Sequence, residues 1–152
     1  MAVAEKVLLV DDHEDNLFAL QSALSSLGHP LETATSGDAA LKAVLRGGVA
    51  VTVLDVVMPG VSGLDVLRYM QRLEQTRHIP VLLVTGMGVD TRLAQEAMRL
   101  GAADLLVKPI DPWALRIKVN YLHRAGRLLS PRPGRAPARG RPVPVPPPGA
   151  AG

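Results

Sequence analysis

Four short runs of the chain are apolar almost throughout, and between them apolar residues recur every three or four positions. The runs at residues 7–10, 49–54, 81–84 and 105–107 predict strands that are buried on both faces of a sheet. Residues 31–35 instead alternate apolar and polar positions, which is typical of a strand nearer a sheet edge. We therefore expect five strands.

A segment with helical periodicity follows each predicted strand. The apolar residues of these segments fall on one helical face, as expected of helices that cover a sheet. The first helix is expected to run through Leu27 and end at Gly28. The other predicted boundaries are Ser36 and Gly47 around the second helix, Gly63 before the third, Gly101 after the fourth, and Asp111 with Pro112 at the start of the fifth.

The strict alternation of strands and helices predicts an α/β fold. Each right-handed crossover between parallel strands needs a helix, so the pattern indicates one doubly wound parallel sheet with helices on both faces. Ligands of such sheets bind beyond the carboxyl ends of the strands. The residues that follow each strand are therefore the candidates for function.

Composition divides the 152 residues into one domain and a tail. Residues 1–123 contain all 14 acidic residues and 11 of the 17 basic ones, whereas the residues after His123 contain six arginines and no acid. The segment from Pro131 onward has eight prolines among Arg, Ala and Gly, a composition that predicts disorder. We expect a folded domain over 1–127 and a disordered Pro/Arg-rich tail over 128–152.

Several classes of protein are disfavoured by the same sequence. The chain has no cysteine, so disulfides and thiolate metal sites are excluded. No apolar run is long enough to span a bilayer, and the first residues do not resemble a signal peptide, so we expect a cytoplasmic protein that does not bind membranes. The basic tail lacks aromatic residues and a folded element that could read bases, so we do not expect the chain to bind nucleic acid.

Polar side chains follow four of the five predicted strands. They are Asp11 and Asp12, Asp55, Thr85, and Lys108. Each alone could be a helix cap, a turn residue or a solvated side chain. Together, three carboxylates at one sheet edge would repel one another unless a hard divalent cation, Mg²⁺ or Mn²⁺, lay among them. Since no phosphate-binding glycine motif is present, the group predicts that Asp55 acts as a nucleophile toward a phosphoryl group delivered from elsewhere.

The motifs at these positions resemble the receiver domain of two-component response regulators. They are residues 7–12 (VLLVDD), 54–60 (LDVVMPG) with Gly63, 84–86 (VTG) and 107–109 (VKP), and the resemblance covers about residues 5–124. It implies a flavodoxin-like fold with strand order 2-1-3-4-5 and a cis bond between Lys108 and Pro109. It also implies that Asp11 and Asp12, with Asp55 and the backbone carbonyl of Val57, bind Mg²⁺.

The same resemblance implies a function in a phosphorelay. Asp55 would be the phosphoacceptor, and Thr85 and Lys108 would contact the phosphoryl group and report it. The donor would be the phosphohistidine of a sensor histidine kinase or phosphotransfer protein, and the output would pass to a partner protein that the sequence does not identify. The sequence does not decide whether the domain forms a homodimer through its last two helices. The chain would not be an enzyme acting on other substrates.

Three positions depart from the usual pattern of these receivers. Leu105 occupies the position of a switching aromatic ring, so aromatic switching is not expected. Val57 and Met87 occupy the positions whose side chains set the dephosphorylation rate. Neither can orient an attacking water, which predicts a slowly hydrolysing aspartyl phosphate.

Two alternative functions remain. A pseudo-receiver would bind partners without phosphorylation, although the complete acidic cluster disfavours it. A small-molecule phosphatase of the haloacid-dehalogenase type would need an Asp-x-Asp motif, and this chain has Asp11-Asp12-His13 instead. The four histidines have no metal-ligand spacing, and we expect none of them to be catalytic.

Overall fold

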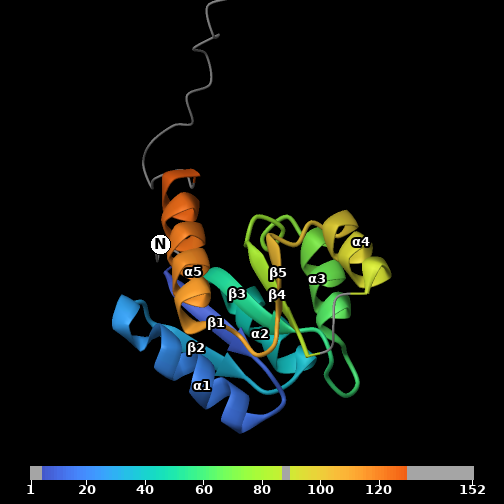
Figure 1. Cartoon of the computed structure of the whole chain (residues 1–152). Coiled ribbons are helices and arrows are strands. Elements are labelled where there is room, and N and C mark those ends of the chain that lie inside the picture. Colours follow the sequence, from blue (N-terminus) through green and yellow to red (C-terminus); the bar gives the residue numbers. More distant parts are fainter. Residues whose placement is uncertain (1–4, 87–89, 130–152) are drawn as a thin grey trace, which may run out of the picture.

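The computed structural model describes residues 5–86 and 90–129, which form a five-stranded sheet with helices on both faces (Figure 1). The elements in chain order are β1 (Lys6–Val10), α1 (Glu14–Leu24), the 3₁₀ turn η1 (Ser25–Leu27), β2 (Leu31–Ala34), α2 (Gly37–Arg46), β3 (Val49–Asp55), α3 (Gly63–Arg72), β4 (Val81–Thr85), α4 (Thr91–Arg99), β5 (Asp104–Val107) and α5 (Pro112–Leu129). The five predicted strands and five predicted helices are all present.

The sheet is parallel and its strands follow the order β2-β1-β3-β4-β5. The three central strands β1, β3 and β4 are the longest apolar runs of the sequence, and β3 is buried along its whole length. The alternating strand β2 lies at one edge, as its pattern indicated. The doubly wound, flavodoxin-like fold is therefore confirmed.

Two apolar layers pack against the sheet, one on each face. Alternate residues of β1 divide between them: Leu8 and Val10 face α2, α3 and α4, whereas Val7 and Leu9 face α1 and α5. Every large side chain of this core is aliphatic or methionine. The aromatic residues of the described chain, Phe18, Tyr69, Trp113 and Tyr121, are all exposed.

Most predicted helix boundaries are confirmed by capping contacts. Ser36 accepts a hydrogen bond from the Ala39 amide at the start of α2, and Asp111 accepts one from the Trp113 amide at the start of α5. The first helix differs from expectation, because the α-helix ends at Leu24 and a 3₁₀ turn carries the chain to Gly28. Serines are weak helix formers, and the Ser25 hydroxyl donates to the Ser22 carbonyl, which competes with the helical pattern.

The last helix continues to Leu129, and the rest of the predicted tail lies outside the described residues. Within residues 5–86 and 90–129, no helix combines the length and the apolar composition that a membrane span requires.

Candidate functional site

The polar residues predicted from the strand ends converge at one edge of the sheet. Asp11 follows β1, Asp55 is the last residue of β3, Thr85 is the last residue of β4, and Lys108 follows β5. Because neighbouring parallel strands end at the same edge, residues that are far apart in the sequence become neighbours here. Asp11, Asp55 and Thr85 are buried, with exposed fractions of 2%, 5% and 4%. Burial strengthens the electrostatic interactions among these side chains.

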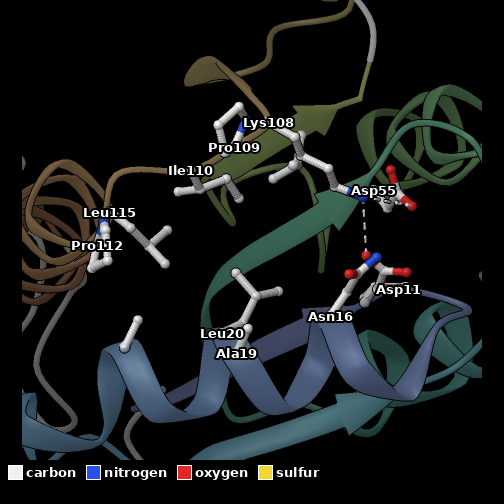
Figure 2. Close-up of a pocket in the computed structure, with 13 residues that line it drawn as sticks. Asp11, Asn16, Ala19, Leu20, Asp55, Lys108, Pro109, Ile110, Pro112 and Leu115 are labelled. Carbon is white, nitrogen blue, oxygen red and sulfur yellow. Dashed lines mark hydrogen bonds and ion pairs between the residues drawn. The ribbon is translucent and has the colours of Figure 1, made fainter.

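Lys108 links the two buried carboxylates. Its Nζ lies 3.4 Å from Asp11 Oδ2 and 3.7 Å from Asp55 Oδ2, and Figure 2 shows its side chain extending across the strand ends toward them. Both distances exceed the 2.7–2.9 Å or so of a tight charge-assisted hydrogen bond. The ammonium is therefore shared between the carboxylates and held firmly by neither.

The electrostatics of Asp55 follow from this arrangement. Burial raises the pKa of the Asp55 carboxyl above its ordinary value, and the negative charge of Asp11 raises it further, whereas Lys108 opposes both effects. Asp12 adds a smaller repulsion in the same direction. A positive charge placed among these carboxylates would lower that pKa and keep Asp55 ionised.

The carboxylates at the end of β1 have the donor chemistry of a divalent-cation site. One ligand atom from each of Asp11, Asp12 and His13 lies within 4.8 Å of the others. Asp12 Oδ1 is buried and accepts no hydrogen bond among the described residues; the nearest basic partner there is the exposed His13 ring, 3.2 Å away. A buried carboxylate oxygen without a hydrogen bond is costly, and a hard cation is a natural partner for it. The residues present therefore fit Mg²⁺ or Mn²⁺.

His13 belongs to this cluster, which the sequence reasoning did not foresee. Its Nδ1 lies 3.4 Å from Asp11 Oδ1 and 3.2 Å from Asp12 Oδ1, and its amide donates to Asp11 Oδ1. The signal in the sequence is its position directly after the two aspartates, and a spacing between histidines does not contain it. The histidine side chain is largely exposed and can contact a group that enters from solvent.

An open cavity of about 450 Å³ adjoins Asp55 between the end of β4 and the start of α1. Thr85, Lys108, Asp55 and Val57 all line it, so residues with a hydroxyl, an ammonium and a carboxylate border one space. Val57 donates its amide to Asp55 Oδ1 over 3.4 Å, and its side chain is 71% exposed. The role of its carbonyl as a metal ligand stays a prediction.

The start of α3 fixes the backbone that carries Asp55. Gly63 donates its amide to the Val56 carbonyl, and a Cβ added to Gly63 would lie 2.8 Å from Val56 Cα and 2.9 Å from the Asp55 carbonyl carbon. Only glycine allows this close approach of helix and strand end. The glycine of the receiver-like motif therefore has a packing function here.

The resemblance to receiver domains also singles out three further positions. The Lys108–Pro109 bond is cis, as the resemblance implied. Leu105 is a partly buried core residue on β5. Met87, the second position expected to influence dephosphorylation, lies outside the described residues.

Two histidines lie near the amino end of β1, at the opposite end of the strand from Asp11. The rings of His29 and His123 stack with centroids 3.8 Å apart, and His123 Nε2 donates to the carbonyl of Glu5, the residue before β1. They are therefore remote from the acidic cluster.

Known proteins resemble this chain over most of the described residues. The family model for the response regulator receiver domain matches residues 7–120. Response regulator PleD of Caulobacter vibrioides is 37% identical over 123 residues, which is 80% of this chain and 27% of PleD. Response regulator protein FleR of Pseudomonas aeruginosa is 44% identical over 126 residues, which is 83% of this chain and 26% of FleR. This chain thus spans about a quarter of the length of these relatives.

Solved structures agree with these matches. A response regulator receiver domain protein from Clostridium thermocellum superimposes with a TM-score of 0.75 at 31% identity, covering 83% of this chain and 99% of that one. The chemotaxis protein CheY4 of Vibrio cholerae superimposes with a TM-score of 0.72 at 29% identity, covering 80% of this chain and 99% of that one. Almost the whole of each neighbour corresponds to the domain described here.

Proposed function

This chain belongs to the response regulator receiver domain family of two-component systems, and we propose that its Asp55 accepts a phosphoryl group from a phosphohistidine. The donor is a sensor histidine kinase or a phosphotransfer protein, and a partner protein receives the signal. The observation that carries the proposal is the Lys108 ammonium lying 3.4 Å from Asp11 and 3.7 Å from Asp55, beside a cavity that Thr85 also lines.

The residues of the site divide the chemistry among them. A carboxylate oxygen of Asp55 attacks phosphorus, the bond from phosphorus to the histidine nitrogen breaks, and its electron pair stays on the imidazole. The product is an acyl phosphate on Asp55. Lys108 and the Thr85 hydroxyl are close enough to the cavity to contact phosphoryl oxygens, which supports roles in alignment and charge stabilisation.

The acidic residues would hold the metal that such a reaction needs. Asp11, Asp12 and Asp55, with the backbone carbonyl of Val57, are the proposed ligands of Mg²⁺ or Mn²⁺. When bound, the cation supplies positive charge to the carboxylates and to the phosphoryl oxygens. Because burial and Asp11 raise the pKa of Asp55, this charge also favours the ionised nucleophile.

A single experiment tests the proposal. The full chain is incubated with Mg²⁺ and phosphoramidate, and intact mass is expected to show one added phosphoryl group. Asp55→Asn should abolish it, whereas Asp38→Asn, which removes an exposed carboxylate in the first turn of α2, should leave it. The absence of an adduct on the wild type would favour a pseudo-receiver. Multiple turnover of organic phosphates would favour a phosphatase.

We also propose that the phosphorylated state is long-lived. The exposed side chain beside Asp55 is that of Val57, which has no group that could orient an attacking water. Val57→Gln introduces an amide at this position and should shorten the lifetime of the aspartyl phosphate. Mass spectra taken at intervals after removal of the phosphodonor measure the decay. A wild-type lifetime of only seconds would contradict the proposal.

A further inference from the structure

A second cleft leaves the acidic cluster in the direction away from Thr85. It has a volume of about 350 Å³ and runs between α1 and the segment that joins β5 to α5 (Figure 2). Its floor includes the buried aliphatic side chains of Leu20, Val84 and Leu115. The phosphoryl chemistry proposed above uses the polar end of this cleft and leaves its apolar length without a function.

Small side chains on α1 keep the cleft open. Asn16, Ala19 and Ala23 recur at helical spacing and line one wall, and Pro109, Ile110 and Pro112 line the other. The larger Leu17, Leu20 and Leu24 of the same helix belong to the core layer. Arg116 Nε of α5 donates to the Ala23 carbonyl over 2.6 Å and ties the two helices together near this end of α1. The width of the cleft is therefore set by the fold, and no side chain need move to form it.

The polar end of the cleft has an excess of negative charge. Asp11 and Asp55 both line it and share the single ammonium of Lys108 at 3.4 and 3.7 Å. Asn16 lines the same end and offers a neutral amide. Two buried carboxylates beside one loosely held cation are complementary to a second positive charge. The apolar remainder of the cleft is complementary to a hydrocarbon body.

We propose that this cleft binds a small organic amine with an apolar body. The ammonium binds the carboxylates of Asp11 and Asp55 beside the Lys108 ammonium. The body lies between Ala19 and Ala23 on one side and Ile110 on the other. At a liquid-like share of about 30 Å³ for each non-hydrogen atom, the cleft holds roughly a dozen such atoms. The ammonium and a divalent cation use the same carboxylates, so the two ligands exclude each other.

The probe is 4-phenylbutylamine, titrated into the full chain without divalent cations and followed by amide NMR and calorimetry. Saturable binding is expected, with amide shifts at Ala19, Ala23 and Ile110. The neutral isostere 4-phenylbutan-1-ol should bind at least about tenfold more weakly, because it lacks a hydrogen bond between charged groups. The anion 4-phenylbutyrate should bind more weakly still, and Mg²⁺ should displace the amine.

Substitutions that fill the cleft distinguish amine binding in the cleft from Mg²⁺ binding at the acidic cluster. Ala23→Leu adds bulk to the apolar wall and should weaken amine binding at least about tenfold while Mg²⁺ binding stays as in the wild type. Ala19→Leu is a second variant at an exposed position of the same wall, in case the first disturbs folding. Ser22→Leu adds bulk at an exposed position of α1 that does not line the cleft, and should change the binding of neither the amine nor Mg²⁺.

Three results would overturn the proposal: no saturable binding of the amine, equal affinity for amine and alcohol, or amine binding that survives both alanine substitutions. No phosphodonor is present in these titrations. The outcome is therefore independent of whether Asp55 accepts a phosphoryl group.

Discussion

Replacing Gly63 with alanine tests how the fold holds the end of β3, which carries Asp55. The added Cβ would lie 2.8 Å from Val56 Cα and 2.9 Å from the Asp55 carbonyl carbon, and closer still to the Asp55 carbonyl oxygen. All three atoms belong to the backbone, so no flexible side chain can move aside. The first turn of α3 and the end of β3 must therefore separate.

The expected loss of stability combines two opposing effects. Overpacking of this kind costs about 1–3 kcal/mol, and contact with backbone places it toward the upper end. Alanine gains at most about 1 kcal/mol over glycine in a helix, and less in a first turn. The net loss is about 2 kcal/mol, which changes the folding equilibrium roughly 30-fold. The same displacement moves the Asp55 backbone, so phosphorylation by phosphoramidate should also fall.

Urea unfolding of the two variants Gly63→Ala and Gly126→Ala measures the effect against a matched control. Gly126 lies within α5, and apart from its neighbours in the helix a Cβ there would meet no atom of the described residues within 4 Å. That variant should be as stable as the wild type or up to about 1 kcal/mol more stable. If Gly63→Ala matched Gly126→Ala, the close approach of α3 to Asp55 could not be the reason for glycine at this position.

Three further predictions concern buried polar groups. Thr52 and Thr76 are both fully buried, but Thr52 Oγ1 has no partner among the described residues, whereas Thr76 Oγ1 donates to the Met70 carbonyl over 2.7 Å. In urea unfolding, Thr52→Val should therefore raise the free energy of unfolding by about 1 kcal/mol, and Thr76→Val should lower it by about 1 kcal/mol. Equal changes in the two variants would contradict this prediction. Burial, and then the charge of Asp11, raise the pKa of Asp55 in the folded protein above the ordinary carboxyl value of 3.8. Between 3.8 and that raised pKa the folded protein binds more protons at this carboxyl than the unfolded chain does. The free energy of unfolding of the wild type therefore falls as the pH rises through this range. Without divalent cations, Asp55→Asn should become more stable relative to the wild type as the pH rises from about 3.5 to 7. If the difference between their free energies of unfolding stayed constant over this range, the pKa of Asp55 would not be raised. Mg²⁺ should raise the melting temperature of the wild type more than that of Asp55→Asn, since the variant loses a charged ligand.

The fold could be predicted from the sequence because burial on both faces leaves an unambiguous pattern. The apolar runs of β1, β3 and β4 allow no other assignment once helical segments separate them. The end of α1 was predicted less well, because the leucine stripe continues through Leu27 while Ser25 and Ser26 weaken the helix before it. Periodicity records which face is buried, but not which hydrogen-bonding pattern the backbone adopts there.

The candidate site was predictable in its residues and not in its surroundings. Topology alone brings Asp11, Asp55 and Lys108 to one edge, so their contacts follow from strand order. The cleft beside them depends on how far α1 stands from the β5–α5 segment. That distance is set jointly by Ala23 and by the Arg116 contact from α5, and no sequence pattern contains it.

Lys108 stands between the two spaces that meet at Asp55, since it lines both the cavity beside Thr85 and the cleft along α1. Its contacts of 3.4 and 3.7 Å are long enough for a stronger partner to displace it. A phosphoryl group on Asp55 would attract the ammonium toward the Thr85 side, whereas an amine in the cleft would compete with it for the carboxylates. Leu105 stands in place of an aromatic switch residue, so we propose that movement of Lys108 reports the state of this site.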